Sequence, residues 1–129
     1  MAQLAQEYRF AFYFGTDDNF FNDPQRATEI VETLASTDVG DLPLRKRVRW
    51  GTEATVHDTL QMKARLVSAR KAGMMAVWLG VEDVTATLVK KGQGGDKSLE
   101  AMRLLQEEGI MPVPMLMHHE GQPLVTRKG

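Results

Sequence analysis

The pattern of hydrophobic and polar residues begins with a strand-like run and continues with a helix-like one. Residues 8–14 are rich in aromatic side chains and stop at Gly15, which predicts a short strand. Asp23 and Pro24 then supply an N-cap and a first helical residue. Four apolar residues follow at the helical spacing i, i+3, i+4 and i+7: Ala27, Ile30, Val31 and Leu34. The first part of the chain therefore predicts a strand followed by a helix.

The two patterns recur in the middle of the chain. Residues 47–54 alternate partially in polarity and predict a second strand. A helix is expected next, with Thr59 as its N-cap and Gly73 as its end. One side of this helix is expected to carry Leu60, Lys63, Ala64 and Val67. Residues 74–79 are continuously apolar, which is typical of a strand covered on both faces in a parallel sheet.

A last helix and strand complete the pattern. Asp96 is the predicted N-cap of an amphipathic helix that ends at Gly109. Residues 110–117 predict the last strand. This strand contains Pro112 and Pro114, which favour a sheet edge because proline has no N–H to donate. The aromatic first strand is expected at the opposite edge.

The alternation of strands and helices predicts an α/β fold in which consecutive strands are parallel. About four parallel strands and three helices are expected, like part of a β/α barrel. The length of 129 residues fits a single domain over residues 1–129. Residues 1–7 and 121–129 are expected to be flexible tails.

Composition excludes several classes of protein. Sixteen basic against 17 acidic residues give a net charge of −1, so no nucleic-acid partner is expected. The sequence contains no cysteine, which excludes a disulfide scaffold and any metal or iron–sulfur site built on cysteine ligands. No apolar run is long enough to span a membrane and no signal peptide is evident, so a cytoplasmic protein is expected.

Acidic residues and histidines follow all four predicted strands. Active sites in parallel α/β folds form beyond the carboxyl ends of the strands, so this rim is the candidate site. Each of these residues taken alone is more often a turn former or a helix cap, but the four strand ends agree with one another. The residues concerned are Asp17, Asp18 and Asn19, then Glu53, Glu82, His118 and His119.

One interpretation of this rim is a metal site. Carboxylates and imidazoles are suitable ligands for divalent cations. A small metal-dependent hydrolase would use Asp17, Asp18 and Glu82, together with His118 or His119, to bind an ion that activates water. A receiver-like regulatory domain is a weaker alternative, since the fifth strand and the phosphate-binding lysine of such domains are missing.

The order of several motifs also resembles a known family, the radical S-adenosylmethionine enzymes, and within it the subgroup that often carries a cobalamin-binding domain upstream. Residues 14–21 with Asp23-Pro24 resemble the second β/α unit of the family, and residues 48–54 resemble its third strand. Residues 72–82, which end in Gly-Val-Glu, are similar to its fourth strand, although Asp83 stands where serine is usual. Residues 91–110 resemble the helix that leads to the fifth strand.

The resemblance implies a fragment of a six-unit partial barrel without the cysteine loop that binds the four-iron cluster. An iron–sulfur cluster is therefore impossible through this chain's own side chains, no catalytic residue is assigned, and radical chemistry by this chain alone is not expected. S-adenosylmethionine is the cofactor that the resemblance implies. Its implied contacts are Asp17, Asp18 and Asn19 near the methionine end, and Glu53 and Glu82 in the same cavity.

A parallel sheet of about four strands also has implications for partners. It leaves two open edges and needs cover on both faces. We therefore expect a homodimer, for example two halves that complete one barrel, or a second chain that supplies the missing barrel units.

Overall fold

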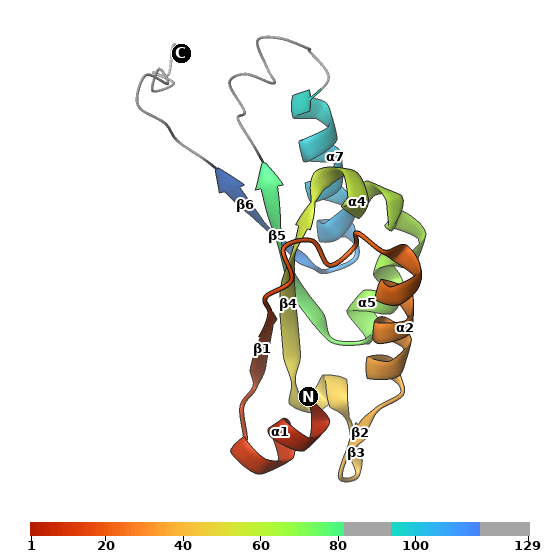
Figure 1. Ribbon diagram of the computed structural model, residues 1–129, viewed down its shortest axis with the longest axis vertical. Helices are drawn as coiled ribbons and strands as arrows, with labels where there is room; N and C mark the ends of the chain where they lie inside the picture. Colours follow the sequence, from red (N-terminus) through yellow and green to blue (C-terminus); the bar gives the residue numbers. More distant parts are fainter. Residues whose placement is uncertain (82–93, 117–129) are drawn as a thin grey trace.

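The computed structural model, which describes residues 1–81 and 94–116, confirms the α/β fold. A four-stranded parallel sheet runs through the molecule (Figure 1). Its strands, in spatial order, are β1 (Phe12–Gly15), β4 (Arg49–Thr55), β5 (Met74–Val81) and β6 (Met111–Leu116). The aromatic strand and the proline-containing strand lie at the two edges, as the sequence predicted.

The connections between these strands are mostly helical. The main helices are α2 (Pro24–Ala35), α4 (Val56–Gln61), α5 (Leu66–Lys71) and α7 (Gly94–Glu107). The shorter elements are α1 (Ala2–Tyr8), α3 (Leu44–Arg47), the 3-10 turn η1 (Lys63–Arg65) and a small antiparallel pair, β2 (Asp38–Val39) and β3 (Leu42–Pro43). No described helix is long and apolar enough to cross a membrane.

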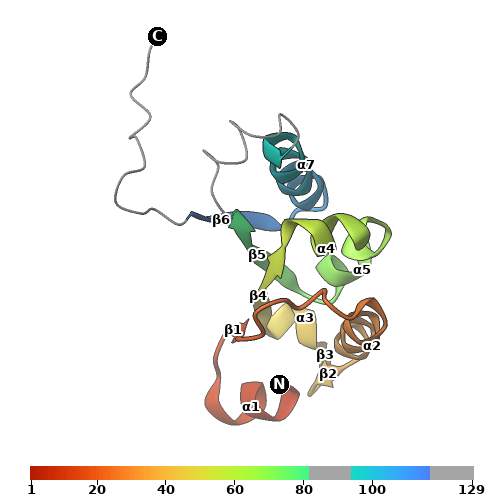
Figure 2. The same cartoon turned by 45° about the horizontal axis from the view of Figure 1, so that its top comes forward.

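The described helices α2, α4, α5 and α7 all lie on one side of the main sheet (Figure 2). Each strand is added beside the previous one in a constant direction, so crossovers of constant hand place their helices on the same side. The expectation that the third strand would be covered on both faces is therefore wrong for the described residues. We call the side of the sheet away from these helices the bare face.

The core lies between the sheet and the helices. Trp50 and Ala54 from β4 and Val77 and Leu79 from β5 point into it, and all four are nearly inaccessible to solvent. Alternate residues of the same strands point to the bare face, because side chains alternate along a strand. An irregularity in the β4–β5 ladder places the exposed Met75 out of this alternation. Along each strand, alternate residues therefore belong to the core and to the bare face.

Helix α2 begins as the sequence predicted. The Asp23 carboxylate accepts a hydrogen bond of 3.0 Å from the backbone N–H of Arg26, and Pro24 occupies the first helical turn. Ala27 and Val31 are buried against the sheet. The N-cap supplies a partner for an otherwise unpaired amide, which explains why the helix begins at this residue.

The next helix begins earlier than expected. Thr55, not Thr59, is its N-cap, since the Thr55 hydroxyl accepts a hydrogen bond of 3.1 Å from the Asp58 backbone N–H. Thr59 lies inside α4, fully buried, and donates its hydroxyl to the Thr55 carbonyl at 2.7 Å. The 3-10 turn η1 then shifts the buried side of the segment. The buried residues are Thr59, Met62, Leu66 and Ala69, whereas Lys63, Ala64 and Val67 are exposed.

Other boundaries differ by smaller amounts. Helix α7 begins at Gly94, so Asp96 is its third residue and not the residue before it. Both predicted helix ends are confirmed, because Gly73 and Gly109 have the positive φ angles of 99° and 73° that glycine tolerates.

The N-terminal segment forms a second, smaller core. Helix α1 covers residues where the sequence pattern predicted no regular element, and it includes Tyr8, which was expected in the first strand. Arg9 ends α1 in the left-handed conformation, and β1 then begins at Phe12. Ala5 of α1 packs with Val39, Leu44 and Val48. This cluster lies at the end of the sheet where β4 begins (Figure 1).

Candidate functional site

The loop after β1 is held against the end of β4. The backbone N–H of Phe20 donates a hydrogen bond of 2.9 Å to the carbonyl oxygen of Glu53. Phe21 is almost completely buried in the main core, and the Phe20 ring meets Trp50 edge to face at 5.3 Å. These contacts bring the loop that carries Asp17, Asp18 and Asn19 to the strand that carries Glu53. Two of the predicted strand ends therefore meet at one rim.

The side-chain amide of Asn19 makes hydrogen bonds within the chain. Its side-chain N–H donates to the Asp58 carboxylate at 2.6 Å, and its side-chain oxygen accepts from the Thr55 backbone N–H at 3.3 Å. The Thr55 hydroxyl donates to the same Asp58 oxygen at 2.9 Å. We call Asn19, Thr55 and Asp58 the polar clamp. It ties the loop after β1 to the beginning of α4.

The polar clamp changes the acidity of Asp58. The Asn19 hydrogen bond lowers the pKa of this carboxyl below its ordinary value of 3.8. Partial burial opposes this effect, while the Thr55 hydrogen bond and the nearby His57 add to the lowering of the pKa. Asp58 is therefore a carboxylate over the whole neutral pH range and acts as an acceptor in the clamp.

Asp17 and Asp18 are both exposed to solvent. The Asp17 carboxylate accepts a hydrogen bond of 3.2 Å from the Asn19 backbone N–H, which forms a local turn. The structure describes no ion pair for either residue. Asp17 thus shapes the loop, and the charge of Asp18 faces water beside it.

Glu53 lies on the bare face. It is in register with Trp78 of β5, and neither residue belongs to the main core. The Phe14 ring meets Trp78 edge to face, with ring centres 4.8 Å apart. Gly51 makes room for this arrangement, because a Cβ atom there would lie 2.7 Å from the Trp78 ring and 3.3 Å from Phe12. A half-buried carboxylate therefore stands beside an aromatic cluster.

The two tryptophans lie on opposite faces of the sheet. Trp50 lies in the main core, where its indole N–H donates to the Ala72 carbonyl at 3.1 Å, whereas Trp78 lies on the bare face. The position of Trp78 between the buried Val77 and Leu79 was the available signal, since neighbouring residues of a strand face opposite sides. Asp58 was missed as a positioning residue, although its spacing from Thr55 is that of a capping pair.

The other predicted site residues are not placed. Glu82, His118 and His119 lie outside the described residues, so the rim they would complete is untested. Within residues 1–81 and 94–116, no three acidic or histidine side chains gather as ligands for a metal ion. The metal-dependent hydrolase remains a prediction that gains no support from the described part of the chain.

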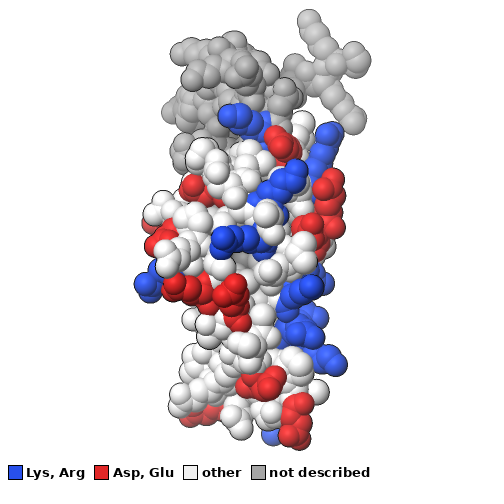
Figure 3. Space-filling view, turned by 90° about the vertical axis from the view of Figure 1, so that its right-hand side faces the viewer, with Lys and Arg blue, Asp and Glu red and all other residues white. Residues whose placement is uncertain are grey.

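Three surface hollows that described residues line are on the helices. One of about 360 Å³ lies along α2, one of about 180 Å³ lies between α2 and the η1–α5 segment, and one of about 440 Å³ lies along α7 beside Lys63. Acidic and basic residues interleave over the helix-covered side of the molecule (Figure 3). None of these three hollows includes a predicted site residue.

Comparisons with known proteins support the fold alone. No protein-family model matches the chain, and no curated protein sequence matches it. Among solved structures, the crystal structure of methylornithine synthase matches 88% of this chain, with 18% sequence identity and a TM-score of 0.54. The match covers 32% of that protein, so this chain spans about a third of its length. At this identity the likeness shows the fold alone, a parallel α/β arrangement shared with part of methylornithine synthase.

Proposed function

We propose that this chain is a partial radical S-adenosylmethionine-like domain that keeps part of a pocket for S-adenosylmethionine. Two independent lines support the proposal. The order of motifs along residues 8–117 resembles that family. The fold matches about a third of methylornithine synthase, a radical S-adenosylmethionine enzyme. The finer resemblance to the cobalamin-associated subgroup stays a prediction.

The iron–sulfur cluster of that family does not fit this chain. Such clusters are held by cysteine thiolates, and the sequence contains none. The chain alone has no means to deliver an electron to the sulfonium of S-adenosylmethionine. We therefore propose a binding role, with any radical step dependent on a second chain that supplies the missing barrel units.

The observation that best supports a retained pocket is the arrangement at Glu53. The hydrogen bond from Phe20 to the Glu53 carbonyl brings the acidic loop to this strand, and the aromatic pair Phe14 and Trp78 lies on the same face as the Glu53 side chain. A sulfonium cation is attracted to aromatic faces, and an ammonium group pairs with a carboxylate. S-adenosylmethionine carries both cations, so its methionine end matches this combination.

The predicted ligand residues then divide into two roles. Glu53, Asp17 and Asp18 supply carboxylates that the described structure leaves without an ion pair. Asn19 instead positions the loop, because both ends of its side-chain amide are occupied by the polar clamp. Glu82 keeps its predicted role as a further ligand, outside the described residues.

The test is calorimetric titration of the metal-stripped protein with S-adenosylmethionine. We expect saturable binding that Glu53→Gln weakens at least about tenfold, since the exchange removes a charge paired with the ligand's ammonium group. The matched control is Glu107→Gln, an exposed glutamate on α7, which should bind as the unchanged protein does. S-adenosylhomocysteine, which lacks the sulfonium charge, should bind more weakly.

Two results would contradict the proposal. One is the absence of binding at millimolar ligand, and the other is equal affinity of the Glu53→Gln variant and the unchanged protein. Metal analysis of the purified protein addresses the alternative directly. A stoichiometric divalent ion, lost on His118→Ala or His119→Ala, would favour the metal-dependent hydrolase.

A further inference from the structure

The two edges of the main sheet differ in their capacity to pair with another strand. A parallel ladder needs N–H donors from both strands, and proline has none. Within β6, the donors to β5 must therefore come from Met111, Val113 and Met115. Since successive residues of a strand direct their backbone groups to opposite sides, Pro112 and Pro114 face the outer edge. That edge lacks two donors and is a poor site for a further strand.

The β1 edge carries no such block. The backbone N–H of Arg49 donates to the carbonyl of Ala11 at 2.9 Å, so the odd-numbered residues of this segment face β4. Phe12 and Phe14 consequently direct both their N–H and their C=O groups outward. No described strand pairs with them. Among residues 1–81 and 94–116, the β1 edge is thus a complete set of donors and acceptors with no neighbouring strand.

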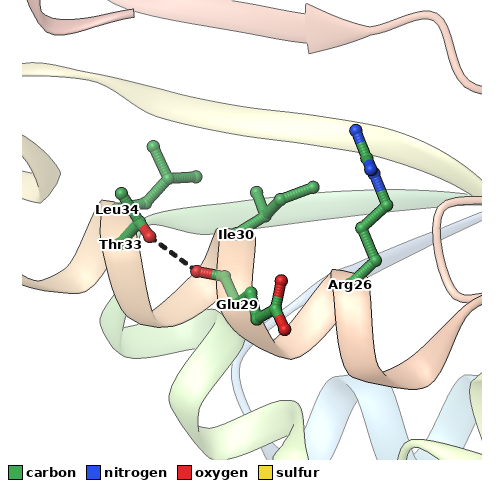
Figure 4. Close-up of a pocket in the computed structure, with 5 residues that line it drawn as sticks. All are labelled: Arg26, Glu29, Ile30, Thr33 and Leu34. Carbon is green, nitrogen blue, oxygen red and sulfur yellow. Dashed lines mark hydrogen bonds between the residues drawn. The ribbon is translucent and has the colours of Figure 1, made fainter.

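Helix α2 has one side that faces away from α5 and toward the side on which β1 runs. One side of this helix packs toward α5, where Thr28 and Glu32 line a small hollow with residues of the η1–α5 segment. The other side lines the 360 Å³ hollow, in which Ile30 is 37% exposed. The residues that line it are Arg26, Glu29, Ile30, Thr33 and Leu34 (Figure 4). In that view Arg26, Ile30 and Leu34 extend from α2 toward the side on which β1 runs.

We propose that the β1 edge and this outer side of α2 together form a two-fold interface with a second copy of the chain. A two-fold axis brings identical surfaces together, so the surface must complement itself. The α2 side does so, because it carries one cation, Arg26, and one anion, Glu29, beside the apolar Ile30 and Leu34. An antiparallel pair of α2 helices whose two-fold axis passes between residues 27 and 28 places each Arg26 opposite Glu29 of the partner subunit, with Ile30 one turn further along.

The strand register follows from the same symmetry. A two-fold axis makes the two β1 strands antiparallel and joins the two sheets into one of eight strands. The outward-facing backbone groups then form two hydrogen-bonded pairs. In each pair, Phe12 of one copy lies opposite Phe14 of the partner subunit. Tyr13 lies between them and meets its own copy on the axis. Its side chain, 38% exposed, is on the helix side of the sheet and thus below the paired α2 helices.

This arrangement differs from two halves that complete one barrel. Barrel closure requires β6 of each copy to pair in parallel with β1 of the other, and the outward prolines of β6 remove the donors for that ladder. The β1-to-β1 pairing uses the edge that has all of its donors. The inference does not rest on S-adenosylmethionine binding and can fail independently of it.

The absence of cysteine allows a clean cross-linking test. Residues in a non-hydrogen-bonded antiparallel pair have Cα atoms about 4.5 Å apart, within the range that a disulfide spans. We expect the single variant Tyr13→Cys to form a covalent dimer on mild oxidation. Met111→Cys, an exposed position on the opposite edge, is the control and should remain a monomer on a denaturing gel.

A charge exchange tests the helix side of the interface. Sedimentation velocity of the unchanged protein at micromolar concentration should give a dimer. Arg26→Glu and Glu29→Arg should each raise the dissociation constant at least about tenfold, because each places like charges opposite each other. The double variant restores opposite charges and should recover the dimer. Far-UV circular dichroism of each variant confirms that α2 still forms.

Three results would overturn the proposal. The first is a monomer of the unchanged protein at 100 μM, a concentration chosen as about a hundredfold above a micromolar dissociation constant. The second is failure of Tyr13→Cys to cross-link while the chain is folded. The third combines two cross-linking results: a mixture of Phe14→Cys and Met115→Cys chains forms a covalent dimer, and Tyr13→Cys forms none. That combination would indicate barrel closure through β6.

Discussion

Individual polar residues at the rim act first on the chain itself. Asn19 was predicted as a cofactor ligand on the basis of its place after a strand, and it lies at that place. Its amide, however, satisfies the Asp58 carboxylate and the Thr55 backbone, so it orders the loop that presents Asp17 and Asp18. A residue type and its position indicate where polar chemistry gathers. They do not indicate which partner satisfies each side chain.

The polar clamp predicts a pH-dependent contribution to stability. Because the folded pKa of Asp58 lies below its ordinary value of 3.8, the clamp stabilises the fold fully above that pH. The contribution is lost as the pH falls through the folded pKa. Asn19→Ala should raise the pKa of Asp58 and, at pH 7, lower the free energy of unfolding by about 1 kcal/mol.

The measurement is urea unfolding at pH 7 and at pH 3, with the Asp58 titration followed by NMR. The matched control is Asn22→Ala, an exposed residue of the same loop, which should change neither quantity. If the pKa of Asp58 were unchanged in the Asn19→Ala variant, the Asn19 hydrogen bond would not be the cause of the lowered pKa.

Element boundaries follow local chemistry wherever a cap or a glycine decides them. Asp23 begins α2 and Gly73 ends α5 as predicted. The beginning of α4 was missed by four residues, because Thr55 and Thr59 are both good caps in sequence. The choice between them depends on Asn19, which is distant along the chain and accepts the hydrogen bond from the Thr55 N–H. A contact from another element thus sets this boundary.

The packing of β4 against β5 on the bare face predicts a matched pair of glycine variants. A Cβ atom on Gly51 would lie 2.7 Å from the Trp78 ring and 3.0 Å from the Ala76 carbonyl oxygen, so Gly51→Ala must displace both. We expect a loss of about 1–3 kcal/mol in the free energy of unfolding. A Cβ atom on Gly80 would meet nothing within 4 Å, so Gly80→Ala should change stability by less than about 0.5 kcal/mol.

Chemical denaturation of the two variants gives the comparison, and tryptophan fluorescence reports the displacement of Trp78. Equal stability of Gly51→Ala and Gly80→Ala would mean that the Trp78 ring does not rest on Gly51.

At the scale of the whole molecule, the main core of the described residues lies on one side of the sheet. The main core lies between the strands and the helices, and the bare face contributes the aromatic cluster of Phe12, Phe14 and Trp78 outside it. Exposed apolar side chains at the β1 end, including Phe12 and Tyr13, are the surface that a partner would cover. The partial-barrel fold thus leaves apolar side chains exposed at its β1 edge, and the proposed dimer would cover them.

The location of the core predicts unequal effects of two leucines on α7. Leu105 is completely buried in the main core, whereas Leu99 is 53% exposed. Leu105→Ala should lower the free energy of unfolding by about 2–5 kcal/mol, because it leaves a cavity. Leu99→Ala should change it by less than about 0.5 kcal/mol. Thermal and urea unfolding measure both, and similar losses for the two variants would contradict the position of α7 on the sheet.

The sequence by itself determined the alternation of strands and helices, the cap at Asp23, the edge position of the proline-containing strand and the absence of cysteine ligands. Each of these depends on residue type and short-range spacing, which a single chain displays directly. Only the tertiary structure decided that the described helices cover one face of the sheet, that Trp78 lies on the other and that Thr55 begins α4. These features depend on contacts between segments that are far apart in sequence, such as Asn19 with Asp58 and Phe14 with Trp78. Local periodicity distinguishes the two faces of a strand, but the path of the whole chain decides which face the helices cover.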